Sequence, residues 1–505
     1  MKILSTEQVR KADQYTIKNE PIASIDLMER ASKVFCKWFT SNFHDRSSVS
    51  VFCGQGNNGG DGLVVSRILL KKGFSVKTVV LKLKEKGSPD FESNLKRLQD
   101  LSKSKITFIS AEKDIEKIDA GSIAIDALFG SGLDRPLEGL PEKLVKALNN
   151  AASIRVAIDI PSGLKADSPS SGTIFMADYT FSFERPKLSF FLAQHFPYVG
   201  YWISRSIGLD PEFIAKQDCT YHLIDFSDAA QLLKTRYKFN HKGDFGHALL
   251  IGGSYGKAGA IILAAKACLR TGAGLTTAHI PSFAVTALHS SVPEVMLSID
   301  AHKYLVSAVD IPTIVNAIGI GPGLGQDAQT QSAIEKLISN AQIPSVWDAD
   351  ALNILAKKPD LLQKLPENTI LTPHPKEFER LFGKSKDDWA QLELLKEKAK
   401  ALKLIIVLKG GHTAIALPDG SIYWNNTGNP GMATGGSGDV LTGLICGFLA
   451  QEYSAAAAAI LGVYLHGMAG DLALKKLHPN FLIASDIVKY FNKALRACNK
   501  INSTF

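Results

Sequence analysis

One pattern recurs along most of the chain: a short apolar run, then a loop rich in glycine or acidic residues, then a segment with helical spacing. The runs are 49–53, 75–81, 123–127 and 155–160 in the first half, and 247–251, 275–280, 317–320, 346–347, 369–371 and 404–408 in the second. Consecutive parallel strands need a crossover of a dozen or more residues, which is usually a helix. The alternation therefore predicts α/β domains built on doubly wound sheets.

The length of the chain predicts more than one such domain. At 505 residues it exceeds what a single hydrophobic core usually supports. The strand pattern pauses over residues 210–228. We therefore place the boundary between residues 224 and 225, which gives one domain over residues 1–224 and another over residues 225–505.

The composition favours a soluble globular protein, since 45% of the residues are apolar and 21% are charged. No apolar run reaches the roughly 18 residues of a membrane helix, and the first residues lack the apolar segment of a signal peptide. We therefore expect a cytoplasmic protein that binds no membrane. The net charge of +8 comes from lysines spread along the chain, which does not favour nucleic-acid binding. Six scattered cysteines without a Cys-x-x-Cys pair argue against a zinc site or a disulfide framework.

Three loops of the first half follow apolar runs and carry oxygen ligands. The loop GQGNNGGDG holds Asn57, Asn58 and Asp61, while Asp126 and Asp159 lie at the ends of two further runs. Loops at the carboxyl ends of parallel strands converge on one ligand crevice. Their carboxylate and amide oxygens suit a hard cation together with a polar ligand. Each loop by itself is also compatible with a capped turn or a buried carboxylate at a strand end.

The stretch NPGMATGGSGDVLTGLICG in the second half has the pattern of a glycine-rich loop that runs into a helix. Gly435, Gly436 and Gly438 allow backbone N–H groups to approach phosphate oxygens, and the helix dipole adds partial positive charge. Asp439 is costly beside an anion, so its position indicates a base or a group that orients a hydroxyl. The alternative is a glycine-packed helix start that Asp439 caps.

Two further residues of the second half follow apolar runs. Lys409 is followed by two glycines, an arrangement that suits contact with a diphosphate. His374 lies between prolines in TPHPKEF, which restrict its loop. A surface lysine and a structural loop histidine are the alternatives for these two positions.

The motifs GQGNNGGDG, DALFGSGLDRP and DIPSG, in this order, resemble the N-terminal domain of the NAD(P)H-hydrate repair proteins, an NAD(P)HX epimerase. The resemblance covers roughly the first two hundred residues and implies a Rossmann-like α/β/α sandwich. It implies potassium ligation by Asn58, Asp126 and Ser162, and substrate binding and acid/base catalysis by Asp159; the role of Lys187 stays open. The nucleotide hydrate would also contact Asn57, Asn58, Gly59, Gly60, Asp61, Gly130, Ser131, Gly132, Leu133, Asp134, Arg135 and Pro136.

The motifs GPGLG, DADALN, TPHPKEF, KGG and NPGMATGGSGD resemble the dehydratase domain of the same proteins, which is ribokinase-like. The resemblance spans the whole second half. It implies that Ala260, Gly323 and His374 line the hydrate site and that Asp439 is the catalytic base against the hydrated ring. The adenine nucleotide would be held by Lys409, Gly410, Gly411, His412, Thr413 and Gly438.

The resemblance implies a bifunctional repair enzyme and a homo-oligomer. The first domain would interconvert the R and S epimers of NADHX and NADPHX, the hydrated forms of the reduced cofactors. The second would dehydrate the S form, with ADP as phosphoryl donor because the fused domain order resembles bacterial members, and with Mg²⁺ present. One rival is an ordinary ribokinase-like kinase; another is a first domain that binds a nucleotide without catalysis.

Overall fold

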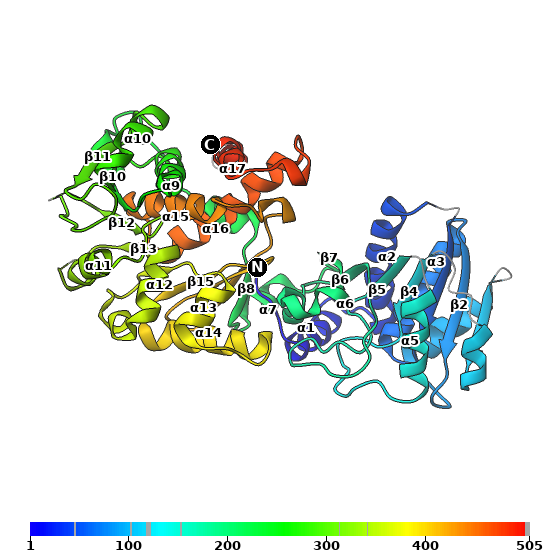
Figure 1. The fold of residues 1–505 in the computed structure, drawn as a ribbon. Helices are drawn as coiled ribbons and strands as arrows, with labels where there is room; N and C mark the ends of the chain where they lie inside the picture. The colour runs from blue at the N-terminus through cyan, green and yellow to red at the C-terminus, as the bar shows by residue number, and fades with distance from the viewer. Residues whose placement is uncertain are drawn as a thin grey trace. The chain divides into compact units, whose positions relative to one another are not determined.

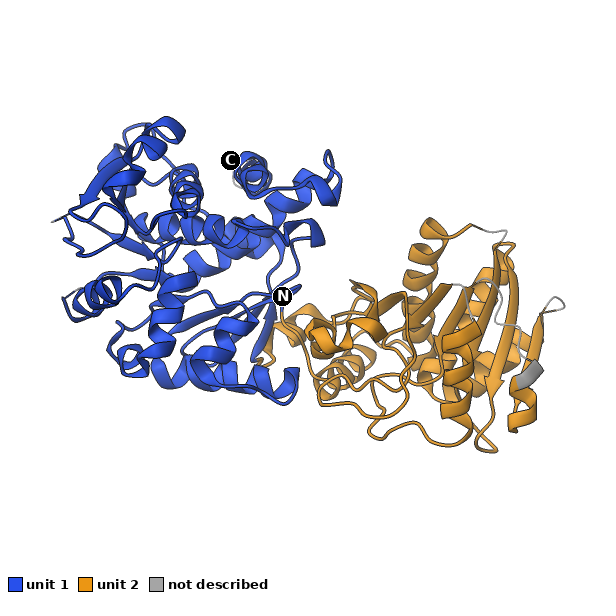
Figure 2. Ribbon diagram, viewed as in Figure 1, with its two compact units in different colours: residues 1, 220–505 blue, residues 2–219 orange. Residues whose placement is uncertain are grey.

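The computed structural model describes residues 1–44, 47–101, 104–117, 123–151, 154–312, 314–340 and 342–499. The chain forms two compact units, one of Lys2–Cys219 and one of Met1 with Thr220–Phe505 (Figure 2). The two units divide after residue 219, five residues before the predicted boundary. Strand β8 (Tyr221–Leu223) pairs with β17 (Ile422–Asn425), so it belongs to the sheet of the second unit.

The first unit contains a seven-stranded parallel sheet in the order β3-β2-β1-β4-β5-β6-β7. The order reverses between β1 and β4, as in a doubly wound fold. Its strands are β1 (Ser48–Cys53), β2 (Ser75–Leu81), β3 (Lys105–Ile109), β4 (Ile123–Ala127), β5 (Ile154–Ile158), β6 (Tyr179–Phe183) and β7 (Tyr201–Arg205). Its helices are α1 (Thr6–Asn19), α2 (Ser24–Asn42), α3 (Asn57–Lys71), α4 (Pro89–Gln99), α5 (Leu140–Ala151), α6 (Phe196–Val199) and α7 (Pro211–Lys216).

The second unit contains a ten-stranded sheet in the order β11-β10-β9-β12-β13-β14-β15-β16-β17-β8. Strands β9 to β15 are parallel, and β16 is antiparallel to both of its neighbours. The strands are β9 (His247–Ile251), β10 (Leu275–Pro281), β11 (Met296–Asp300), β12 (Ala317–Ile320), β13 (Ser345–Trp347), β14 (Ile370–Leu371), β15 (Ile405–Leu408) and β16 (Thr413–Ala416), with β17 and β8. The helices are α8 (Phe226–Leu232), α9 (Ala258–Thr271), α10 (Val285–Ser291), α11 (Ala328–Asn340), α12 (Ala349–Lys357), α13 (Pro375–Phe382), α14 (Asp388–Leu402), α15 (Ser437–Ala450), α16 (Ala455–Leu474) and α17 (Ala484–Asn499).

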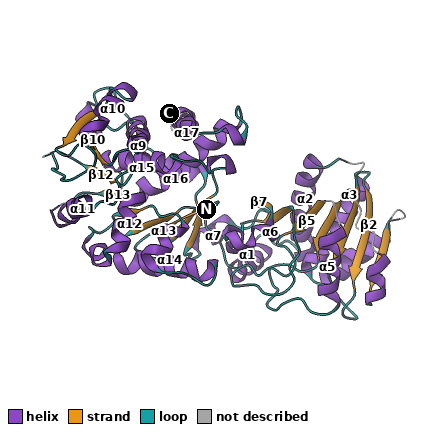
Figure 3. Cartoon of the chain, in the orientation of Figure 1, coloured by secondary structure: helices purple, strands orange, loops and turns teal. Residues whose placement is uncertain are grey.

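Each sheet separates two hydrophobic cores, because successive side chains of a strand point to opposite faces. In β1, Val49 and Val51 belong to one core and Phe52 to the other. In β9, Leu250 belongs to one core and Leu249 to the other. Helices lie on both sides of the strands within each unit (Figures 1 and 3). This confirms the predicted α/β class and explains why the strands read as continuous apolar runs.

Most of the glycine-rich segment GQGNNGGDG, which the sequence predicts to be a loop, belongs to helix α3. Helix α3 begins at Asn57, so Gly59 and Gly60 lie in its first turn. A Cβ on Gly59 would stand 1.7 Å from the carbonyl oxygen of Gly54. Only glycine permits this approach, which holds the first turn of α3 against the end of β1.

Among the described residues, helix α16 is the one helix long and apolar enough to cross a membrane by length and composition, although His466 and Asp471 interrupt its apolar run. The helix has 20 residues, and its mean hydropathy is 1.4 over a window of 18 of them. Of the residues in that window, 67% are buried inside the unit. Alanine and glycine make up much of the helix, and small side chains let it pack closely against α15 and α17. It is placed as a core helix.

The contact of α15 with α9 gives a test of this packing. A Cβ on Gly443 would stand 2.1 Å from the carbonyl oxygen of Ala264, which is backbone and cannot move cheaply. We expect Gly443→Ala to lower the free energy of unfolding of the second unit by about 1–3 kcal/mol. Urea denaturation measures the change. Gly411→Ala is the control, since a Cβ there meets nothing within 4 Å; equal midpoints for the two variants would contradict the packing.

Candidate functional site

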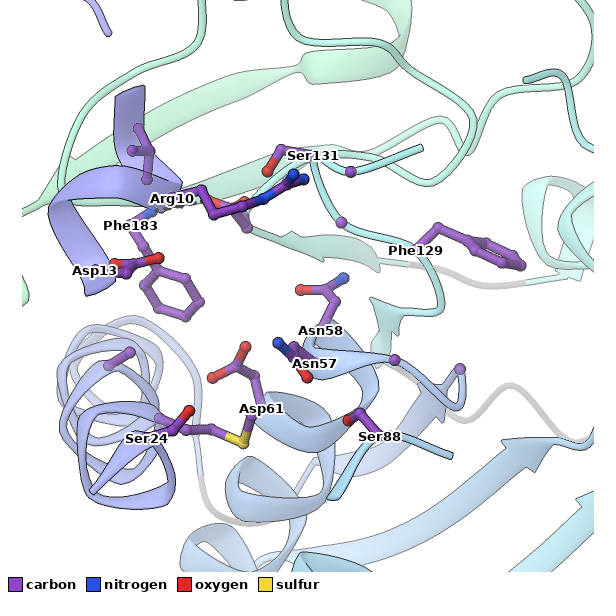
Figure 4. Close-up of a pocket in the computed structure, with 18 of the residues that line it drawn as sticks. Arg10, Asp13, Ser24, Asn57, Asn58, Asp61, Ser88, Phe129, Ser131 and Phe183 are labelled. Carbon is purple, nitrogen blue, oxygen red and sulfur yellow. Dashed lines mark hydrogen bonds between the residues drawn. The ribbon is translucent and has the colours of Figure 1, made fainter. Parts of the chain in front are cut away.

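The first unit has a cavity of about 950 Å³ at the carboxyl ends of its strands. Its wall includes residues of helix α1, the start of α3, and the loops that follow β1, β2, β4 and β5. Figure 4 shows Asn57, Asn58 and Asp61 on one side of this space and Arg10 and Asp13 on another. Of the predicted residues, the wall includes Asn57, Asn58, Asp61, Gly130, Ser131, Gly132, Leu133 and Asp159. The reversal of strand order thus brings the predicted loops together.

Other predicted contact residues of this half are absent from the wall. Gly59 and Gly60 are buried beneath it within α3. Asp134 and Arg135 are exposed in the loop after β4, and Pro136 follows them half-buried. Asp126 and Ser162 are buried, at 0% and 1% exposure.

Asp159 is paired with a buried lysine. Its Oδ1 accepts hydrogen bonds from Lys187 Nζ at 2.7 Å and from the backbone N–H of Phe183 at 3.2 Å. The Lys187 side chain is only 3% exposed. Asp159 has φ of 65°, a left-handed conformation that is uncommon for residues other than glycine. Strain of this kind concentrates at functional sites, and here it turns the carboxylate toward both the cavity and Lys187.

Two further carboxyl groups share this cavity. Burial and the charge of Asp159 raise the pKa of Asp61 well above its ordinary value, although Ser32 donates to its Oδ1 at 3.3 Å. Burial and, after it, the charge of Asp159 raise the pKa of Asp13 to about 7, although the charge of Lys187 lowers it. Both of these carboxyl groups are therefore protonated more readily than a freely exposed aspartate.

Two of the predicted cation ligands, Asp126 and Ser162, are buried and are not part of this wall, whereas Asn58 belongs to it. The Asp126 carboxylate accepts hydrogen bonds from Ser162 N and Ser162 Oγ, each at 2.7 Å, and from Leu128 N at 3.0 Å. Burial raises its pKa to about 6 despite these bonds. No lysine, arginine or histidine of the described residues forms an ion pair with it. The buried amide Nδ2 of Asn58 also has no hydrogen-bond partner among them.

The second unit has a cavity of about 470 Å³ lined by Gly256, Lys257, Gly259, Ala260, Gly323, Ala349, Asp350, Asn353, Glu377 and Asp439. Asp439 lies in the first turn of α15, and Gly436 precedes that helix in the left-handed conformation. No side chain caps the start of α15, so its first N–H groups are available to an anion. Burial and the charge of Asp348 raise the pKa of Asp439 to about 6.

A second aspartate, Asp348, accepts hydrogen bonds from two side chains close to Asp439. Asp348 is buried; its Oδ1 accepts from Lys409 Nζ at 2.7 Å, and its Oδ2 accepts from Thr442 Oγ1 at 2.8 Å. A Cβ on Gly438 would lie 3.5 Å from Lys409 Nζ and from Asp348 Oδ2. Lys409 is thus anchored beside the start of α15.

The cavity wall also holds an ion pair. Asp350 Oδ2 accepts from Lys257 Nζ at 3.0 Å and from Gly325 N at 2.9 Å. Gln326 Nε2 donates to its Oδ1 at 3.0 Å. Ala349, next to it, has φ of 50°, a second strained residue at a cavity wall.

Several predicted residues of this half lie outside that wall. His374 caps α13 by accepting from Lys376 N and Glu377 N, so its ring stands beside Glu377, which does line the cavity. The predicted nucleotide ligands also lie off the wall: Lys409, Gly410, Gly411, His412, Thr413 and Gly438. The first four of them form the turn between β15 and β16, and Thr413 begins β16. Burial lowers the pKa of His412 to about 4.

Sequence reasoning missed the contributions of Asp13, Arg10 and Lys257. Asp13 and Arg10 belong to one face of α1, and a helix that precedes the first strand gave no sign of facing the loops. Lys257 stands in a glycine-rich segment after β9, directly before the start of α9. A helical face that mixes apolar with acidic residues, rather than a motif, was the available signal for Asp13.

Family models match both units. Residues 24–189 match the family described as YjeF-related protein N-terminus, and residues 248–493 match that described as NAD(P)H-hydrate dehydratase. Full-length relatives include bifunctional NAD(P)H-hydrate repair enzymes. That of Moorella thermoacetica is 36% identical over 98% of this chain and 97% of its own length. That of Escherichia coli is 33% identical over 95% and 91%.

A solved structure matches the second unit. The ADP/ATP-dependent NAD(P)H-hydrate dehydratase of Bacillus subtilis, co-crystallised with ATP and Mg²⁺, is 33% identical, with a TM-score of 0.50. The match covers 55% of this chain and 98% of that one. The match supports the fold of the second unit. The chain belongs to the family of bifunctional NAD(P)H-hydrate repair enzymes.

Proposed function

We propose that the first unit interconverts the R and S epimers of NADHX and NADPHX, and that the second dehydrates the S epimer with ADP as phosphoryl donor. The observation that carries the proposal is the position of Asp439. Its carboxylate lines a cavity at the uncapped start of α15, with Lys409 anchored close behind. A base beside an anion-binding helix start suits a hydroxyl that receives a phosphoryl group.

In the second unit, Asp439 takes the proton of the C6 hydroxyl as that oxygen attacks the terminal phosphoryl group. The N–H groups at the start of α15 stabilise the charge on the transferring phosphoryl. The C6–O bond then breaks, and phosphate leaves with the bonding electrons. C5 loses a proton to solvent, which restores the C5–C6 double bond of the reduced ring. ADP thereby becomes AMP and phosphate. Lys409, which pairs with Asp348 beside the start of α15, would contact the diphosphate.

The wall of the second cavity fits Mg²⁺ that arrives with the nucleotide. Asp350, Asn353 and Glu377 present carboxylate and amide oxygens there, and Mg²⁺ usually binds one or two carboxylates together with substrate phosphates and water. Asp350 and Glu377 would hold it. When bound, it would neutralise phosphate charge.

The buried groups behind the first cavity fit a potassium ion. A carboxylate buried without a cation is costly, and Asp126 forms no ion pair among the described residues. The Asn58 side chain, whose amide oxygen can ligate a cation, lines the cavity wall. Asn58, Asp126 and Ser162 would hold K⁺, which would supply positive charge for the substrate's phosphates.

The test uses the full chain and a mixture of hydrate epimers, with and without ADP or ATP. We expect absorbance of the reduced nicotinamide ring to return only with nucleotide, with release of free phosphate, and faster with ADP than with ATP. Both epimers should be consumed, since the first unit converts R to S. A stable phosphorylated alcohol without recovery of the ring would identify a kinase instead.

We also propose that the protein acts in the cytoplasm as a homo-oligomer. Exposed aromatic rings on the second unit support self-association: Tyr255 and Tyr304 are 69% and 45% exposed, with ring centroids 5.0 Å apart. Apolar surface of this kind often marks a site of protein association. Light scattering of the purified protein measures its mass in solution.

A further inference from the structure

Helix α1 presents one face to the first cavity. Thr6, Val9, Arg10, Asp13, Gln14 and Ile17 line it, a spacing of three and four residues that places them on one side of a helix. Arg10 and Asp13 carry the charges of that face. In Figure 4, Asp13 extends from the helix into the space that Asp61 and Asn58 border.

The partners of Asp13 differ from those of Asp159. Asp159 contacts the Lys187 ammonium at 2.7 Å. Among the described residues, the Asp13 carboxylate forms no hydrogen bond or ion pair, although it is half-buried. A half-buried carboxyl group that faces a cavity without a partner is positioned for a ligand.

Inversion at C6 through ring opening needs two proton transfers. The hydroxyl loses a proton and becomes a carbonyl as the C6–N1 bond breaks, and N1 takes up a proton. Rotation about the C5–C6 bond presents the other face of the carbonyl. N1 then adds to that face, gives up its proton, and the oxygen regains one. The step needs one group that accepts a proton while another donates.

We propose that Asp13 is a second catalytic residue of this site, and that it exchanges a proton with N1 while Asp159 exchanges one with the C6 hydroxyl. The proposal rests on the epimerase function proposed above. Asp159, held by a cation, is the group that accepts first, whereas Asp13, without a cation in contact, is the group that enters protonated. On ring closure each proton returns to where it came from.

The electrostatic surroundings agree with this division. The charged groups around Asp13 are Asp159, Lys187, Glu184, Asp61 and Arg10. Burial, then the charge of Asp159 and to a smaller extent that of Glu184, raise the pKa of Asp13 to about 7, although Lys187 lowers it. A pKa near 7 is close to the pH at which a group serves best as both acid and base. Because this pKa is raised, Asp13 contributes most to stability when protonated, and that contribution is lost as the pH rises from about 4 to about 7.

The experiment compares Asp13→Asn with the intact full-length protein on mixed epimers and ADP. The S epimer is consumed in a first phase, and the R epimer in a second phase limited by epimerisation. We expect Asp13→Asn to leave the first phase unchanged and to slow the second by about 10²–10⁴-fold. Asp26→Asn is the matched control, because Asp26 is exposed on α2 and does not line the cavity.

Thermal unfolding at pH 8 separates catalysis from folding. Asp13→Asn removes a charge that burial disfavours, so we expect the first unit to melt at a higher temperature while its epimerase rate falls. Asp13→Glu should recover part of that rate and its pH dependence. A wild-type protein without a second phase above the spontaneous rate would defeat the epimerase function itself. An unchanged second phase in Asp13→Asn, or loss of rate only with loss of stability, would overturn the role of Asp13.

Discussion

Asp439→Asn is expected to lower the dehydration rate by about 10²–10⁴-fold, the usual contribution of a general base. The substitution keeps the shape of the side chain in the first turn of α15 and removes its ability to accept the hydroxyl proton. Nucleotide binding should persist, since the helix N–H groups and the Lys409–Asp348 pair are untouched. Recovery of ring absorbance measures the rate, and calorimetric titration with ADP measures binding.

The pH dependence of the same step follows from the raised pKa of Asp439. A base must be ionised to act, and burial together with Asp348 raises its pKa to about 6. The dehydration rate of the native protein should therefore fall as the pH drops through about 6, and Asp439→Asn should lose that limb of the profile. Asp360→Asn, an exposed carboxylate on the same unit, is the control. A rate within twofold of native in Asp439→Asn would rule out this base.

Asp159→Asn is expected to abolish most epimerisation and also to destabilise the first unit. Loss of the carboxylate removes the proposed proton acceptor, which predicts a rate about 10²–10⁴-fold lower. It also leaves the ammonium of Lys187, 3% exposed, without its counter-charge. Breaking a buried ion pair in this way costs about 3–5 kcal/mol. The second phase of the mixed-epimer assay and urea denaturation measure the two effects.

A double substitution separates those two effects. Asp159→Asn with Lys187→Met removes both charges, so we expect much of the stability to return while epimerisation stays low. Recovery of rate along with stability would show that the pair is structural. Lys187→Met alone should destabilise the unit as well, because Asp159 then lacks its cation.

The sequence was sufficient for the central strands of both sheets because these strands are largely buried on both faces. The runs at 123–127, 247–251 and 317–320 coincide with β4, β9 and β12. Loops after such strands converge by topology, so the grouping of Asn57, Asp61 and Asp159 could be predicted. What local pattern cannot supply is contact between distant segments.

The parts that escaped prediction depend on such contacts. Lys187 meets Asp159 across 28 positions of the chain. Asp13 reaches the same cavity from a helix that precedes the first strand. The short strand β8 could not be predicted from the local sequence, because its partner β17 lies about two hundred positions further along the chain. His374 was expected at a cavity wall and instead caps α13, since its ring nitrogen satisfies two backbone donors.

The seven strands of the first sheet and the first seven of the second follow the same strand order. Reading outward from the reversal, β3-β2-β1-β4-β5-β6-β7 in one unit corresponds to β11-β10-β9-β12-β13-β14-β15 in the other. Two unlike chemistries, an inversion and an elimination, are therefore carried on sheets of the same strand order. The proposed catalytic residues lie on different segments around them: Asp13 on α1 and Asp159 after β5 in one unit, and Asp439 at the start of α15 in the other. An engineer who wishes to move one activity onto the other sheet would have to transfer these segments together.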